Sequence, residues 1–221
     1  MEHIVKILQT EYITHNVKRL KVEKPDNYVF SPGQSTYLAI NQPEWKDKKR
    51  PFTFTGLNSF NYLEFTIKIY PQFNGVTKKI ELLQDGDELI LAEPFGSISY
   101  KGKGIFIAAG SGITPFMAIL RQLYHDQKIK GNILIDVNTT SEDIIYGNEL
   151  NKMLGTNFFS FLTRENVIGF NEKKLKEDNL KEIVRNFSQF FYVCGPEMFV
   201  NDIGILLKKL GAEAEKIVIE K

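Results

Sequence analysis

A glycine-rich segment at residues 109–115, with the sequence AGSGITP, is the first feature that could carry chemistry. It follows an apolar run typical of a strand and precedes a helical pattern. Backbone amides at such a junction can bind phosphate, and glycine allows the ligand to approach closely. Pro115 stands at the third glycine position of the usual dinucleotide-binding pattern. Ordinary strand-to-helix turns can also be rich in glycine, so phosphate binding is a hypothesis at this point.

A second strand–turn–helix junction lies at residues 192–198, with the sequence YVCGPEM. Its cysteine, Cys194, would lie at the carboxyl end of a parallel strand, where open α/β sheets bind ligands. The proline of the turn, Pro196, suits the first turn of a helix. Taken alone, a buried cysteine is more often a packing residue than a reactive one.

Three segments in the first half of the chain are weaker signals. Residues 50–53 (RPFT) combine a cation, an aromatic ring and a hydroxyl group, and residues 67–70 (IKIY) form an apolar strand. Residues 75–77 (GVT) open a helix whose free amides could bind a phosphate. Each segment also has a structural interpretation, as the start of a strand or as an ordinary capped helix.

The elements around these segments fall into two groups. Short apolar runs separated by turn signals dominate residues 1–100 and predict an antiparallel β-barrel or sandwich, with one helix near 77–83. After residues 101–104 (KGKG), strands and helices alternate, which predicts an α/β domain with a parallel sheet. The strands of the first group are predicted at residues 3–8, 17–22, 36–40, 52–56, 63–70 and 88–92. In the second group they are predicted at 105–109, 133–137, 158–162 and 190–194, and the helices at 114–126, 142–154, 172–186 and 196–210. We therefore predict two domains, 1–100 and 101–221.

Composition excludes several classes of function. The chain has 221 residues and a net charge of +1, which gives no basis for nucleic acid as a partner. A single cysteine excludes an internal disulfide and a cluster held by four cysteines of this chain. The three histidines show no metal-ligand spacing, and no metal site is predicted. The N-terminus lacks signal-peptide character and no apolar stretch could span a membrane, so a soluble, cytoplasmic protein is expected.

Together and in this order, the segments resemble the ferredoxin–NADP reductase superfamily over nearly the whole chain. The middle is most similar to NADH–cytochrome b5 reductases, through FTIKIY, LLQDGDELILAEPFGSISYKGKG and NTTSEDII. The resemblance implies an FAD-binding barrel followed by an NAD(P)-binding domain. It also implies an NAD(P)H-dependent flavoprotein reductase that transfers a hydride from NADH or NADPH to bound FAD. FMN stays possible, because the sequence barely defines the adenosine half of the flavin site.

The resemblance assigns roles to particular residues. Arg50 would contact the flavin pyrophosphate, Phe52 would pack on the flavin ring where most relatives have tyrosine, and Thr53 would lie near the ring atom N5. Cys194 would border the nicotinamide, so Thr53 and Cys194 are the catalytic candidates. The other predicted flavin-binding residues are Pro51, Ile67, Lys68, Ile69, Tyr70, Gly75, Val76 and Thr77. Those predicted to bind the nicotinamide nucleotide are Gly110, Ser111, Gly112, Thr114, Pro115, Thr139, Arg164, Gly195, Pro196 and Met198.

The sequence leaves open whether NADH or NADPH is the electron donor, because two segments resemble different branches of the family. Residues 163–164 (TR) resemble the Ser-Arg pair of NADPH-using relatives, whereas residues 138–141 (NTTS) resemble the NADH-using branch. A 2′-phosphate usually needs a cation, so Arg164 is the candidate for binding it.

The sequence departs from the family at two places. The chain ends in IVIEK without the aromatic residue that covers the flavin in many relatives, and the glycine pair before the pyrophosphate helix is reduced to Asn74-Gly75. The expected acceptor is a separate carrier: ferredoxin, flavodoxin or a cytochrome. A basic run at Lys46, Lys48, Lys49 and Arg50 could attract an acidic carrier. The alternatives are a reductase that uses free flavin as substrate and a non-catalytic flavin-binding subunit.

Overall fold

The computed structural model describes residues 1–96, 98–165 and 175–220. The chain forms two compact units, and each is made of two separate stretches of sequence. The first unit comprises Met1–Ser99 and Thr114–Gln122, and the second comprises Tyr100–Ile113 and Leu123–Lys221. Residues 114–122, which follow the first stretch of the second unit, therefore pack with the first unit.

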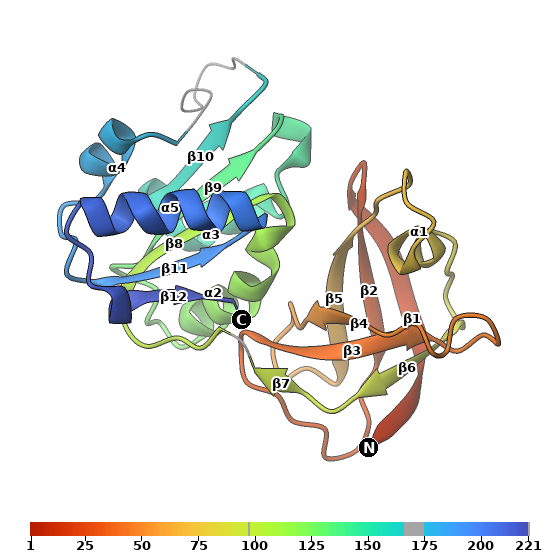
Figure 1. Cartoon of the computed structure of the whole chain (residues 1–221). Coiled ribbons are helices and arrows are strands. Elements are labelled where there is room, and N and C mark those ends of the chain that lie inside the picture. Colours follow the sequence, from red (N-terminus) through yellow and green to blue (C-terminus); the bar gives the residue numbers. More distant parts are fainter. Residues whose placement is uncertain (97, 166–174, 221) are drawn as a thin grey trace. The chain divides into compact units, whose positions relative to one another are not determined.

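The first unit is an antiparallel β-barrel, as the turn-rich apolar pattern predicted (Figure 1). Its strands follow the order β4-β3-β6-β1-β2-β5, and β7 pairs with β3. A bridge between Phe54 and Phe65 joins the two ends of this sheet and closes the barrel. The strands are β1 (Glu2–Thr14), β2 (Val17–Glu23), β3 (Gln34–Ile40), β4 (Arg50–Thr53), β5 (Tyr62–Lys68), β6 (Glu88–Ala92) and β7 (Phe95–Gly96).

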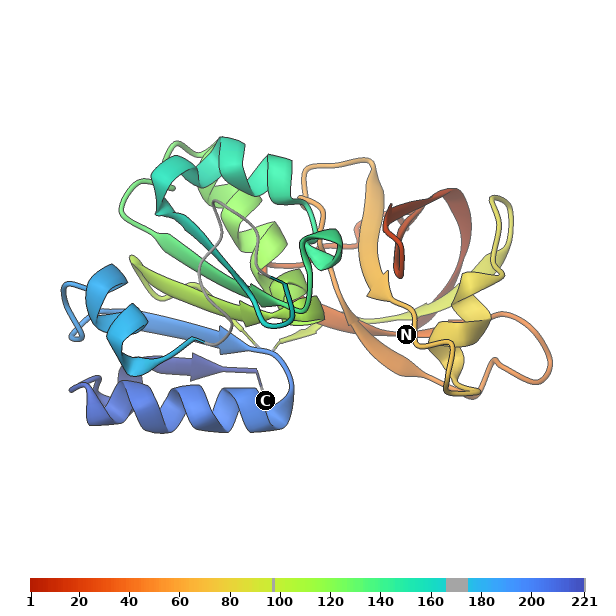
Figure 2. The ribbon, with the colours of Figure 1, turned by 90° about the horizontal axis from the view of Figure 1, so that it is seen from above.

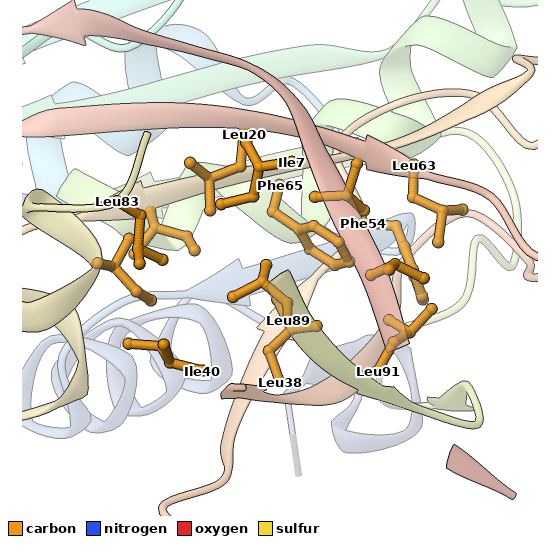
Figure 3. Close-up of a cluster of buried hydrophobic side chains, with 14 of the residues drawn as sticks. Ile7, Leu20, Leu38, Ile40, Phe54, Leu63, Phe65, Leu83, Leu89 and Leu91 are labelled. Carbon is orange, nitrogen blue, oxygen red and sulfur yellow. The ribbon is translucent and has the colours of Figure 1, made fainter. Parts of the chain in front are cut away.

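The barrel interior is filled by apolar side chains from alternate strand positions. Figure 3 shows them pointing toward one another, with Phe54 and Phe65 at the seam. A six-residue helix, α1 (Val76–Glu81), follows β5 and contributes Val76 and Ile80 to the same core. The core therefore fixes where β5 ends and where α1 begins.

A second helix, α2 (Thr114–His125), is attached to the barrel by a buried ion pair. The Arg121 guanidinium donates from Nη1 to Glu64 Oε1 at 2.5 Å and to the Thr55 carbonyl oxygen at 2.7 Å. The side chains of Arg121 and Glu64 are only 11% and 3% exposed. Glu64 also accepts a hydrogen bond from the Thr55 hydroxyl group at 2.9 Å. The pair is therefore part of a buried polar network.

The second unit is built on a five-stranded parallel sheet of order β10-β9-β8-β11-β12. Its strands are β8 (Gly104–Ala109), β9 (Ile133–Asn138), β10 (Phe158–Leu162), β11 (Phe190–Cys194) and β12 (Ile217–Ile219). Figure 2 shows α3 (Gly147–Leu154) on one face of this sheet, and α5 (Glu197–Lys209) on the other. The strand order reverses between β8 and β11, which is the point where open α/β sheets usually bind ligands.

Several predicted elements differ from those observed. β12 was not predicted, and β1 is longer than residues 3–8 because it pairs with both β2 and β6. The helix predicted at 142–154 is divided into a 3-10 turn (Ser141–Asp143) and α3, because Tyr146 adopts the left-handed conformation with φ of 57°. The helix predicted at 172–186 is α4 (Glu177–Ile183), and residues 172–174 lie outside the described residues. Among the described residues, no helix has the length and apolar character needed to cross a membrane.

Candidate functional site

The glycine-rich turn and the cysteine turn meet in the second unit. Residues Gly110–Ile113 form a 3-10 turn directly after β8, and Cys194 is the last residue of the neighbouring β11. A Cβ atom built on Gly112 would lie 2.4 Å from the Cys194 carbonyl oxygen and 2.7 Å from the Gly195 nitrogen. Because both contacts are with backbone, any side chain at position 112 would push the two turns apart. The two predicted nucleotide motifs thus form one surface.

Gly195 imposes a second restriction on this surface. Its φ of 156° is at the limit of the region that favours glycine, and an added Cβ would lie 3.0 Å from the Ala109 Cβ and from the Phe199 ring. Pro196 is the N-cap residue of α5, which begins at Glu197, and Met198 in its first turn is exposed. The backbone of the cysteine turn is therefore held close to the end of β8.

The Cys194 thiol has a hydrogen-bond partner that the sequence analysis did not identify. Its sulfur donates to Glu220 Oε2 at 3.1 Å, and Cys194 is 6% exposed. Burial raises the pKa of the Cys194 thiol, and the nearby Glu220 carboxylate raises that pKa further. Cys194 is therefore a neutral thiol rather than a nucleophilic thiolate. Glu220 reaches it because β12 pairs with β11, and that pairing has no local sequence signal.

The loops after β9 and β10 bring Thr139 and Arg164 together. The Arg164 amide donates to the Thr139 carbonyl oxygen at 3.0 Å, which extends the pairing of the two strands beyond their ends. The Arg164 side chain is exposed. Glu165, which the sequence analysis did not single out, accepts a hydrogen bond from the Ser141 amide at 2.6 Å.

A cavity of about 500 Å³ lies next to these loops. It is lined by Val137, Thr163, Leu175, Phe199, Asp202, Ile203, Ile205 and Leu206.

In the barrel, β4 presents the segment RPFT. Thr53 is buried, with its hydroxyl group 3.1 Å from the Ser35 hydroxyl group, and Phe52 is half-buried against the core. Arg50 is exposed and donates from Nη1 to the Lys49 carbonyl oxygen at 2.8 Å. Pro51 is exposed and lies opposite Tyr37 of β3. Arg50, Pro51 and part of Phe52 are therefore accessible to a ligand.

Some of the other predicted flavin-binding residues face the barrel core, and others are exposed to solvent. Ile67, Ile69 and Val76 point into the barrel core, so only their backbone atoms could contact a ligand. Lys68 is half-buried and Tyr70 is 37% exposed. Gly75 is the N-cap residue of α1, whose first turn begins at Val76 and Thr77, and no side chain described by the structure makes a capping hydrogen bond there.

A buried polar cluster lies on β9 and β10 of the second unit. Asp136 accepts a hydrogen bond from Asn138 at 2.7 Å, and Ser160 is its register partner on β10. Asp136 Oδ1, Asn138 Oδ1 and Ser160 Oγ are buried without a hydrogen-bond partner among the described residues. Burial raises the pKa of Asp136 to about 7, although the Asn138 hydrogen bond opposes the shift.

This cluster predicts that the protein becomes less stable as the pH rises. An unfolded aspartate titrates near pH 4. Between about pH 4 and 7, Asp136 is therefore protonated in the folded chain and ionised in the unfolded chain. The stabilisation from this proton is complete below pH 4 and is lost as the pH rises through about 7. Asp136→Asn should raise the free energy of unfolding at pH 8 by about 1–3 kcal/mol, the usual cost of an unsatisfied buried polar group. Urea titrations at pH 5 and pH 8 would measure the effect, with exposed Asp47→Asn as the control. An unchanged pH dependence in Asp136→Asn would contradict it.

Comparisons with known proteins agree with this architecture. Residues 106–204 match the family model described as the oxidoreductase NAD-binding domain. The chain is 24% identical over 222 residues to the ferredoxin–NAD(P)+ reductase component of the naphthalene 1,2-dioxygenase system from Pseudomonas putida, covering 96% of this chain and 66% of that protein. It is 30% identical over 156 residues to NADH-cytochrome b5 reductase 1 from Aspergillus terreus, covering 64% of this chain and 52% of that protein. The chain thus spans about half to two thirds of the length of these relatives.

A solved structure extends the comparison to both units. The ferredoxin NADP+ reductase from Neisseria gonorrhoeae with bound FAD and NADP has a TM-score of 0.86 and 21% identity, covering 99% of this chain and 98% of that one. The resemblance inferred from the motifs is thereby confirmed: the chain has the fold of this ferredoxin NADP+ reductase, and residues 106–204 match the oxidoreductase NAD-binding domain.

Proposed function

We propose that the chain is an NAD(P)H-dependent flavoprotein reductase that binds FAD in its barrel and passes electrons to a separate carrier protein. The observation that carries this proposal is the contact between the Gly110–Ile113 turn and the Cys194 turn at the reversal of strand order. Gly112 is buried and lets the two turns pack backbone against backbone, which holds the Gly110–Ile113 turn at the end of β8, where a pyrophosphate would bind backbone amides. Bound FAD would accept a hydride and release electrons singly, chemistry that belongs to the cofactor.

The barrel residues fit a flavin. Arg50 offers an exposed guanidinium for the pyrophosphate, and the half-buried Phe52 offers an aromatic face. The Thr53 hydroxyl group shares a hydrogen bond with the Ser35 hydroxyl group, which holds the Thr53 side chain in place. Gly75 and Thr77 can supply amides from the start of α1. These roles support FAD, whose pyrophosphate needs both the cation and the amides.

Cys194 and Glu220 are proposed to hold the nicotinamide ring. The neutral thiol is fixed by its hydrogen bond to Glu220, so its role is positioning rather than proton transfer. Cys194→Ala should slow flavin reduction by NAD(P)H by about 10- to 100-fold, whereas Cys194→Ser should cost less. Glu220→Gln should give a smaller loss, because an amide oxygen still accepts the hydrogen bond.

Stopped-flow reduction of the bound flavin, with a melting curve for each variant, would test these roles. The packing interpretation predicts lower thermal stability with nearly intact hydride transfer, because Cys194→Ala leaves a small cavity. That outcome would show that Cys194 is a packing residue.

Nucleotide choice is proposed to depend on Arg164. Its backbone amide is hydrogen-bonded to Thr139 just after β10 and its side chain is exposed, which supports a role for the guanidinium in binding a 2′-phosphate. Arg164→Ala should therefore weaken NADPH binding by about tenfold or more and spare NADH. Steady-state KM values for both nucleotides would measure this change. The control is Arg185→Ala, which removes an exposed arginine before the start of β11. Equal effects on both nucleotides would refute the role.

The acceptor is proposed to be an acidic redox carrier such as a ferredoxin, a flavodoxin or a cytochrome. The basic run is partly engaged within the chain, because the Lys49 ammonium bonds Glu2 at 2.5 Å and the Lys48 ammonium lies 4.1 Å from the Trp45 ring centroid. These contacts restrict the side chains of Lys48 and Lys49. The basic run as a whole keeps a net positive charge.

The decisive experiment is an anaerobic spectral titration of the purified protein with NADH and NADPH, followed by a panel of acceptors. Bleaching of a stoichiometric flavin followed by carrier reduction would support the proposal. Turnover of added flavin without a bound one would favour the free-flavin reductase. Binding of flavin without any NAD(P)H oxidation would favour the non-catalytic subunit.

A further inference from the structure

Asn74 is an exposed side chain whose chemistry the proposed function does not use. It lies between β5 and α1 and is the only asparagine in the sequence that is followed by glycine. The side-chain amide of an asparagine can be attacked by the backbone nitrogen of the next residue, and glycine leaves that approach open because it has no side chain. A Cβ added to Gly75 would meet no atom within 4 Å outside the two adjacent residues, so the space around this glycine is open.

Lys78 of α1 contacts the amide that would be attacked. Its ammonium nitrogen donates to Asn74 Oδ1 at 3.1 Å, and both side chains are exposed. A cation on a carbonyl oxygen draws electron density from the carbonyl carbon. It also stabilises the negative charge that develops on the oxygen during attack. The contact therefore favours reaction at the Asn74 Cγ atom.

The backbone nitrogen of Gly75 is available as the nucleophile. Gly75 is the N-cap residue of α1, and its carbonyl oxygen accepts a hydrogen bond from the Lys79 amide at 3.2 Å. Within the described parts of the chain, the Gly75 amide itself donates no hydrogen bond. No helical hydrogen bond therefore has to break before this nitrogen can react.

We propose that Asn74 is a site of spontaneous deamidation, and that Lys78 promotes the reaction. The Gly75 nitrogen loses its proton to hydroxide and forms a bond to Asn74 Cγ. The bond from Cγ to the side-chain nitrogen then breaks, and that nitrogen takes a proton from water and leaves as ammonia. Water opens the resulting cyclic succinimide at either carbonyl group, which gives aspartate or isoaspartate. The reaction uses no ligand or cofactor, so it is independent of the proposed function.

Deamidation changes the charge and the backbone just before α1. The new carboxylate would lie beside the Lys78 ammonium and ahead of the first turn of the helix, where a negative charge is favourable. Isoaspartate also inserts a methylene group into the main chain between residues 74 and 75. The original chain and its two products therefore differ in charge or in backbone, and ion-exchange chromatography and peptide mapping can separate them.

The test incubates the purified full-length protein at pH 8 and follows each asparagine by peptide mass spectrometry and isoaspartyl methyltransferase labelling. We expect Asn74 to react faster than Asn27, which is also exposed in a turn but is followed by tyrosine. Lys78→Met should slow the reaction at Asn74 by about fivefold, the rate equivalent of one exposed charge contact. The matched control is Lys79→Met, which removes the neighbouring ammonium group of the same helix and should leave the rate unchanged.

Two further measurements separate the effect of the folded structure from that of the sequence. Gly75→Ala should nearly abolish deamidation at Asn74 and leave the fold intact, because the extended backbone at this position suits alanine and the added methyl group has room. In urea, which unfolds α1, Lys78→Met should react at the wild-type rate. The proposal would be overturned if Asn74 reacted no faster than Asn27, or if Lys78→Met and Lys79→Met reacted equally fast when folded. An effect of Lys78→Met that persisted in urea would overturn it as well.

Discussion

Replacing Gly112 by alanine is expected to reduce the rate of flavin reduction by NAD(P)H by about 100-fold or more, since a displacement of about 1 Å can have an effect of that size. The new Cβ would lie 2.4 Å from the Cys194 carbonyl oxygen and 2.6 Å from its carbon, distances that real Cβ atoms do not show. Backbone atoms cannot rotate away as a side chain can, so the two turns must separate. Separation displaces both the backbone amides proposed to bind the pyrophosphate and the Cys194 thiol. FAD should stay bound, because its predicted contacts all belong to the barrel.

Stopped-flow spectroscopy of the FAD-loaded variant would measure this effect, and the flavin content would be checked by absorbance. Gly204→Ala is a suitable control, since the added Cβ would meet no atom within 4 Å outside its neighbouring residues and the helix's own backbone. Alanine in the middle of α5 should raise stability by about 0.5–1 kcal/mol and leave the reduction rate unchanged. A Gly112→Ala protein that is reduced at the wild-type rate would contradict the assignment of these turns to the nucleotide.

Removing the Arg121 guanidinium is expected to lower the free energy of unfolding by about 3–5 kcal/mol, the usual cost of leaving a buried charge without its partner. Arg121→Met would leave the Glu64 carboxylate, which is 3% exposed, inside the barrel without this cation. It would also remove the donor to the Thr55 carbonyl oxygen. Urea denaturation followed by tryptophan fluorescence and circular dichroism would measure the loss.

A double variant and a surface pair provide the controls. Arg121→Met combined with Glu64→Leu removes both charges and should recover most of the loss, because an apolar pair of similar volume is often neutral. Arg19→Met breaks the more exposed pair with Glu11 and should cost about 1 kcal/mol or less. If Arg121→Met were no more destabilising than Arg19→Met, the network would be energetically unimportant.

The sequence predicted the elements well where the signal is local. Apolar alternation located most barrel strands, and the turns before α2 and α5 carry glycine and proline at the expected places. β12 was missed because three apolar residues gain strand structure only by pairing with β11. Glu220 was missed for the same reason. The pairing of Arg121 with Glu64 joins residues 57 positions apart, and no periodic pattern reports such a contact.

In the candidate site too, the sequence indicated the separate segments but not the contacts between them. Each of its segments is a weak signal alone, and the resemblance to the family depends on their order along the chain. The contact of Gly112 with Cys194 depends on β8 lying next to β11, which follows from sheet order rather than from either motif.

The discontinuous composition of the two units limits how the chain can be divided or recombined. Residues 114–122 pack with the barrel, although they follow the glycine turn of the other unit. In that stretch Phe116, Met117 and Leu120 are fully buried. A fragment ended at residue 100 would lose this apolar segment together with the cation that pairs with Glu64. In a chimera with another barrel in place of the first hundred residues, α2 would remain. Its buried side chains would then face a barrel with which they had not packed. Exchangeable modules in this chain therefore have to include α2 with the barrel, and each transfer requires more than one junction.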